Sequence, residues 1–126
     1  MSEIKTTGAP EAIGPYVQGV DLGFMIITSG QLPINPETKK MPDDVAEQCT
    51  QSLNNAVAII KEAGSDVNKI VKTMVFVKDL NDFAVVNEAY NDFFKAHKAP
   101  FPARSCVEVA RLPMDAKIEI EVIAIK

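Results

Sequence analysis

The spacing of apolar and polar residues along the chain predicts two helices. Apolar residues recur every three or four positions from Val45 to Ala63, which is typical of a helix that buries one face. Gly64 should end this helix, because glycine readily adopts the left-handed conformation of a C-terminal cap. Asp79 or Asn81 can cap a second helix. Its expected buried face consists of Phe83, Val86, Tyr90, Phe93 and His97.

Five other apolar segments predict strands. Two short strands lie within residues 17–30, a longer one covers 70–78, and the last two cover 103–111 and 117–125. The resulting order is two strands, a helix, a strand, a helix and two strands. This order predicts an α+β fold, a two-layer sandwich with both helices on one face of a mixed β-sheet.

Alternation along the last strand predicts which of its side chains meet the helices. Its alternate apolar positions should face the helices, so Glu119 and Glu121 should face away from them. Those apolar positions are Ile118, Ile120, Val122 and Ala124. On the strand before it, Val107 and Val109 form the matching apolar set. The residues then expected on the face of the two glutamates are Arg104, Cys106 and Glu108.

The 70–78 strand is apolar on both faces. Strict alternation puts Val71, Val75 and Val77 on one side, and Ile70, Met74 and Phe76 on the other. The helices can cover only one of these sets. An apolar face without cover is unusual in a monomer, so we expect a homo-oligomer that buries the face containing Met74 and Phe76 or their alternates.

Composition narrows the class of protein. A chain of 126 residues, 47% of them hydrophobic, predicts one folded domain over residues 1–126. The net charge of −4 disfavours a nucleic-acid partner. With His97 as the single histidine, and Cys49 and Cys106 far apart, we expect no metal site and a reducing compartment. Neither a signal peptide nor a long apolar run is evident, which predicts a cytoplasmic protein without membrane contact.

Three motifs resemble the RidA (YjgF) family. They are Ala-Ile-Gly-Pro-Tyr at 12–16, Ile-Thr-Ser-Gly-Gln at 27–31, and Pro-Ala-Arg-Ser-Cys-Val-Glu-Val-Ala-Arg-Leu-Pro at 102–113. The similarity runs nearly from end to end. It implies a chorismate-mutase-like fold and a homotrimer whose sheets form a central β-barrel, with clefts between subunits. It also implies an enzyme without a cofactor that hydrolyses enamine/imine intermediates, such as 2-aminoacrylate, to 2-keto acids and ammonia.

The same resemblance assigns roles to residues of this chain. It implies that Arg104 binds the substrate carboxylate and that Glu119 handles the hydrolytic water. It further implies that the cleft is lined by Tyr16, Ser29, Gly30, Asn87, Cys106 and Pro113.

The chemistry of these residue types agrees with the implied roles, and each residue also has a structural interpretation. Arginine offers a rigid two-donor fork that matches a carboxylate, but Arg104 could instead pair only with Glu119 or Glu121. A glutamate can accept and return the proton of water if burial raises its pKa. Cys106 lacks a predicted histidine partner, which disfavours a nucleophilic role. Asn87 is either a ligand contact or a hydrogen-bonding spacer.

The sequence is compatible with two other functions. A trimer that senses small carboxylates such as 2-ketobutyrate and regulates a partner would need the same arginine. Ribonuclease or translation-inhibitor activity has been attached to some members of the family. The chain lacks the basic groove and the His/Lys pair expected for RNA cleavage, so we place this activity last.

Overall fold

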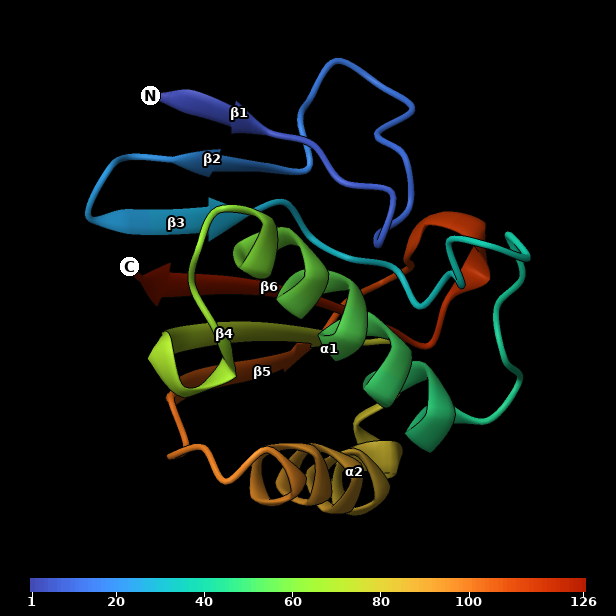
Figure 1. Cartoon of the computed structure of the whole chain (residues 1–126). Helices are drawn as coiled ribbons and strands as arrows, with labels where there is room; N and C mark the ends of the chain where they lie inside the picture. The colour runs from blue at the N-terminus through green and yellow to red at the C-terminus, as the bar shows by residue number, and fades with distance from the viewer.

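Both helices lie on one face of a six-stranded sheet in the computed structural model, which describes residues 1–126 (Figure 1). The strand order is β1-β2-β3-β6-β4-β5. β4 and β5 run parallel, and the other neighbouring strands are antiparallel. This confirms the predicted α+β sandwich with a mixed sheet. The elements are β1 Ser2–Ile4, β2 Gly19–Asp21, β3 Met25–Thr28, α1 Val45–Glu62, β4 Ile70–Val77, α2 Phe83–Ala96, β5 Ala103–Glu108 and β6 Ile118–Ile125.

Helix α1 begins and ends close to the predicted positions. The Asp44 side chain accepts a hydrogen bond from the Glu47 backbone N–H, which satisfies one of the free donors of the first turn. Gly64 has φ +92°, so it takes the left-handed conformation after the last turn. The buried side of the helix, with Cys49 and Leu53 fully enclosed, packs over β6 and β3.

Helix α2 differs from its prediction at both ends. Asp79 caps a short 3-10 turn, Leu80–Asp82, and its side chain accepts from the Asn81 N–H, so neither residue caps α2 itself. The predicted buried face is wrong at its ends: Phe83 is 40% exposed, and His97 lies just beyond the helix. The buried residues are Val86, Tyr90, Phe93 and Phe94. Phe94 joins the core because it lies one turn after Tyr90 on the side facing the sheet.

The faces of β6 agree with the prediction, whereas β4 contains an irregularity. All four apolar residues of β6 assigned to the helix side are buried. In β4 the register shifts between Ile70 and Lys72, so the alternation is interrupted there. Ile70 is therefore buried and Val71 exposed, opposite to the strict alternation we predicted for these two residues. Beyond the bulge, Thr73, Val75 and Val77 face the helices.

The face of the sheet opposite the helices is only partly buried within the chain. We call it the outer sheet face. Strand pairing aligns its residues in rows across β6, β4 and β5, with Phe76 between Glu119 and Val107. Its apolar residues include Ile27, Met74, Phe76, Val107 and Ile123.

The shortest strand, β1, and the C-terminal end of β5 were not predicted correctly. β1 has only three residues, too few for a periodic pattern, and its pairing with β2 was not predicted. β5 ends at Glu108 rather than at Arg111. Neither helix combines the length and apolar character needed to cross a membrane.

Candidate active site

Arg104 lies on the helix side of the sheet, not on the outer face. In the parallel pairing of β5 with β4, Arg104 aligns with Thr73 and Cys106 with Val75. Aligned residues of neighbouring strands share a face, and Thr73 and Val75 are buried against the helices. The prediction that Arg104, Cys106 and Glu108 share the face of Glu119 and Glu121 is therefore wrong. β4 also separates β5 from β6, so these strands are not neighbours.

The position of β5 at the edge of the sheet explains this difference. β5 is the last strand of the sheet, and the side chains on its helix side are half-buried at Arg104 and Cys106 and exposed at Glu108. Glu108 is exposed there, and one of its carboxylate oxygens accepts from the Leu80 N–H at 2.9 Å. Val107 lies on the outer sheet face and is 42% exposed. Apolar character alone therefore assigns the wrong face to this strand.

The Arg104 guanidinium lies against two aromatic rings of α2. Its central carbon is 4.9 Å from the Tyr90 ring centroid and 5.6 Å from that of Phe83. The ion pairs of the chain are Lys61–Asp66, Lys78–Asp115 and Lys126–Asp21, and none includes Arg104. The alternative in which Arg104 pairs only with Glu119 or Glu121 is therefore not realised in this chain.

A pocket of about 550 Å³ opens beside Arg104. Asn87, Tyr90 and Pro102 are among its lining residues. The Asn87 side-chain oxygen is buried and has no hydrogen-bond partner. Such an acceptor is costly to leave unpaired, which favours the interpretation of Asn87 as a ligand contact over that of a spacer.

Cys106 lies two residues after Arg104 on the same side of β5 and packs at the margin of the core. Burial raises the pKa of this thiol, and the opposing effect of the Arg104 charge is smaller. The neutral thiol is therefore the favoured form near pH 7. This agrees with the expectation that Cys106 is not the nucleophile.

Glu119 occupies the outer sheet face beside Gly30. A Cβ atom at position 30 would come within 2.9 Å of the Glu119 carboxyl carbon, so glycine allows the carboxylate to lie against the backbone. Burial, followed by the charge of Glu121, raises the pKa of Glu119. A raised pKa is the property that a carboxylate needs to exchange protons near neutral pH.

The loop around Ser29 supports this arrangement. The Ser29 hydroxyl donates to the Val17 carbonyl, and the Gln31 N–H donates to the Ile120 carbonyl at 2.8 Å. The loop is thereby attached to β6 one residue after Glu119. In this chain the Ser29 hydroxyl thus holds the loop.

Tyr16 and Pro113 lie in a third region. Tyr16 is 51% exposed and lines a pocket of about 710 Å³ together with Ile13 and Met114. Pro113 begins the short 3-10 turn Pro113–Asp115 that contains Met114. Met114, the residue after Pro113, thus shares a pocket with Tyr16.

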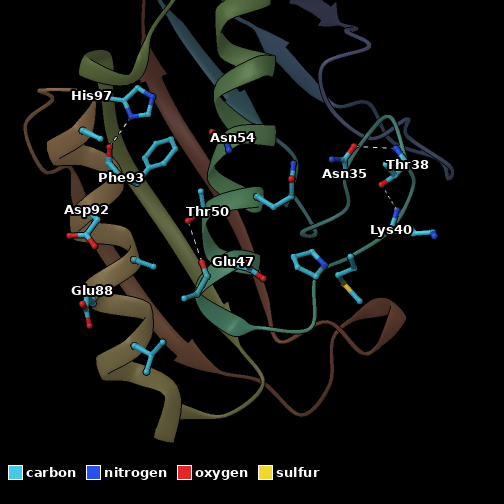
Figure 2. Close-up of a pocket in the computed structure, with 17 residues that line it drawn as sticks. Asn35, Thr38, Lys40, Glu47, Thr50, Asn54, Glu88, Asp92, Phe93 and His97 are labelled. Carbon is cyan, nitrogen blue, oxygen red and sulfur yellow. Dashed lines mark hydrogen bonds between the residues drawn. The ribbon is translucent and has the colours of Figure 1, made fainter.

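Another pocket contains none of the predicted site residues. It measures about 1000 Å³ and lies between α1, α2 and the loop that contains Asn35 and Lys40 (Figure 2). His97 lies at its edge, where Nδ1 is 2.8 Å from the Phe93 carbonyl oxygen. No group of three or more potential metal-binding side chains occurs here or elsewhere in the chain.

The predicted site residues therefore form two separate groups across the sheet. Arg104, Asn87 and Cys106 lie on the helix side, while Gly30 and Glu119 lie on the outer sheet face. One chain cannot bring Arg104 and Glu119 to one small substrate. That Tyr90 and Phe83 are neighbours of Arg104 was not predicted from the sequence. Their seven-residue spacing, two turns of one helix face, was the available signal.

Comparison with known proteins gives consistent matches over the whole chain. Residues 6–126 match the family model described as Endoribonuclease L-PSP. The 2-iminobutanoate/2-iminopropanoate deaminase of Escherichia coli strain K12 is 68% identical over 123 residues, which are 98% of this chain and 96% of that protein.

Solved structures give the same result. The crystal structure of the YjgF gene product from E. coli superimposes with a TM-score of 0.99 at 65% identity, and covers 100% of this chain and 99% of that one. E. coli TdcF with bound serine gives a TM-score of 0.98 at 56% identity, with the same coverage.

Proposed function

The chain belongs to the Endoribonuclease L-PSP family, the RidA (YjgF) family, and we propose from this premise that it is a 2-iminobutanoate/2-iminopropanoate deaminase. The observation that carries the proposal is the 68% identity, over nearly the whole of both chains, to a deaminase of that name. The products are 2-keto acids and ammonia. The enzyme needs no cofactor for this hydrolysis, and we place it in the cytoplasm.

The reaction is an addition followed by an elimination. The oxygen of water forms a bond to C2 of the imine, and Glu119 accepts a proton from that water. That proton passes to the nitrogen, which gives a carbinolamine with a hydroxyl and an amino group on C2. The hydroxyl proton is then transferred to the nitrogen by way of Glu119 as the C–N bond breaks, so that ammonia leaves and the C2 carbonyl forms. An enamine such as 2-aminoacrylate first tautomerises to the imine, a step that can occur in solution.

Arg104 and Glu119 have different roles in this site, substrate binding and water activation. The Arg104 guanidinium binds the substrate carboxylate, because its paired N–H donors match two carboxylate oxygens. Glu119 then activates water at C2, and the raised pKa of its carboxyl suits proton exchange. Asn87 and Cys106 line the cleft beside Arg104. Ser29 and Gly30 line it beside Glu119, and Tyr16 and Pro113 lie at its rim.

The two groups of residues meet only if different copies of the chain supply them. Arg104 and Glu119 lie on opposite faces of one sheet. We infer a homotrimer in which the outer sheet faces form a central barrel, and each cleft combines Arg104 of one subunit with Glu119 of its neighbour. The partly exposed apolar side chains of the outer sheet face support this assembly.

The assembly itself should depend on Phe76. We expect the parent chain to have the mass of a trimer by light scattering at micromolar concentration, and Phe76→Asp to dissociate, because a buried charge on the outer sheet face is costly. Circular dichroism should show that the monomers stay folded. Val85→Asp, a matched control on the exposed side of α2, should remain trimeric. A monomeric parent chain would contradict the proposed assembly.

Mixed subunits test whether one cleft uses two chains. Arg104→Ala and Glu119→Gln should each be nearly inactive alone. When they are unfolded and refolded together at equal amounts, about one quarter of the clefts should contain an intact Arg104 and an intact Glu119 from neighbouring subunits. Deaminase turnover should therefore recover to roughly that fraction of the parent value. If the mixture is no more active than its two components, both residues act within one subunit.

An assay of keto-acid release tests the function directly. 2-Iminobutanoate and 2-iminopropanoate, generated in the cuvette by an amino-acid oxidase, should lose ammonia faster with the protein than without it. A chain that binds 2-ketobutyrate but does not speed this hydrolysis would instead be the small-carboxylate-binding regulator considered above. RNA cleavage stays disfavoured by the net charge of −4 and by the packing of the only histidine, His97, on the Phe93 ring.

A further inference from the structure

Arg104 is oriented through the faces of two aromatic rings. Tyr90 and Phe83 lie seven residues apart on α2, and both rings are within 6 Å of the guanidinium carbon. At this range the negative ring face attracts the cation. Such contacts occupy none of the five N–H donors of the arginine.

Tyr90 is itself held in place. It is 5% exposed, its hydroxyl lies 2.7 Å from the Thr73 hydroxyl oxygen, and its ring packs 4.8 Å from the centroid of Phe94. Thr73 is also the residue of β4 that aligns with Arg104 on β5. The strand pair and α2 therefore determine the ring position together, and the ring in turn limits where the guanidinium can lie.

The hydrogen-bonding edge of Arg104 is left free by this arrangement. No carboxylate of the chain lies within ion-pair distance of the guanidinium. An arginine oriented by an acidic neighbour would have part of its donor fork occupied before the substrate arrives. Orientation by ring faces leaves the two parallel N–H donors available for an incoming carboxylate.

We propose that Tyr90 and Phe83 are positioning residues, an aromatic cradle that holds the Arg104 guanidinium in the orientation that binds the carboxylate of the 2-imino acid. This inference rests on the proposed role of Arg104. It adds that the bidentate geometry depends on α2 as well as on β5. The cradle reduces the conformational freedom that Arg104 would otherwise lose on binding substrate.

The test measures kcat/KM and KM for 2-iminobutanoate in two backgrounds, Arg104 and Arg104→Lys. With Arg104 present, Phe83→Leu should raise KM and lower kcat/KM by about 3- to 30-fold, the range of a cation–π contact. In the Arg104→Lys background the same change should cost clearly less, because the ring still attracts an ammonium but has no plane of donors to orient. Phe83 is 40% exposed, so its replacement does not disturb the core.

Further variants separate positioning from folding. Tyr90→Leu should lose activity in the same way, and Tyr90→Phe, which keeps the ring, should restore most of it. Phe24→Leu makes the same change as Phe83→Leu at a 71% exposed ring in the turn between β2 and β3, and should behave like the parent chain.

Two outcomes would overturn the inference. Equal losses in both backgrounds would mean that the rings act through charge attraction or folding and do not orient the donor plane of Arg104. An unchanged KM in Phe83→Leu and Tyr90→Leu would mean that the rings have no effect on Arg104. Either result leaves the proposed function intact as long as Arg104→Ala impairs turnover. Normal turnover in Arg104→Ala would instead refute the role of Arg104 itself.

Discussion

Arg104→Lys should fold and assemble like the parent chain but lose most of its deaminase activity. Lysine keeps the positive charge, but its ammonium cannot offer two parallel donors to a carboxylate. Charged hydrogen bonds left unmade in the transition state predict a loss of about 2–4 kcal/mol, or roughly 30- to 1000-fold in kcat/KM. The measurement is keto-acid release from 2-iminobutanoate at several substrate concentrations.

The chain offers a matched control for this substitution. Arg111 is the only other arginine, and it is exposed on the connection after β5. Arg111→Lys should retain parent turnover. If Arg104→Lys is also near normal in rate, a point charge suffices and the bidentate assignment is wrong.

Glu119→Gln should bind product normally but hydrolyse imine at least about 10²-fold more slowly, because the amide cannot accept a proton from water. Glu121 lies two residues away on the same face of β6, so Glu121→Gln is the matched control and should change the rate little. Calorimetry with 2-ketobutyrate separates binding from chemistry. A loss of product affinity in Glu119→Gln would mean that this carboxylate serves the binding of substrate rather than the activation of water.

The pH dependence of the parent enzyme gives a further readout of Glu119. Burial and Glu121 raise the pKa of its carboxyl, and the ionised form is the one that accepts a proton. Turnover should therefore fall as pH decreases through this raised pKa, at a higher pH than for an ordinary glutamate. In Glu119→Gln this acid limb should be absent from the residual rate.

Local patterns determined much of the fold. The three- and four-residue spacing from Val45, with Gly64 at its end, predicted α1 because a helix with one buried face requires that period. Alternation along β6 placed Glu119 away from the helices, since successive strand residues face opposite sides. The motif at residues 102–113 indicated the family, and this too is a property of consecutive residues.

The relation between Arg104 and Glu119 was decided only by the tertiary structure. Ala103–Glu108 mixes polar and apolar residues on both sides, so its own pattern does not reveal which side faces the helices. That choice follows from its parallel pairing with β4, in which Arg104 aligns with Thr73. The bulge after Ile70 likewise exchanged the faces of two residues.

Some features could be predicted and others could not because the residues that interact lie at different separations along the chain. Helix period and strand alternation arise from neighbours along the chain, and the sequence of 126 residues therefore determined the helices, most strands and the identity of the family. Strand partner, direction and register depend on contacts between distant segments, and a shift by one residue moves every side chain to the other face. Only the folded chain thus revealed that Arg104 and Glu119 lie on opposite faces, and that Tyr90 and Phe83 lie against the guanidinium.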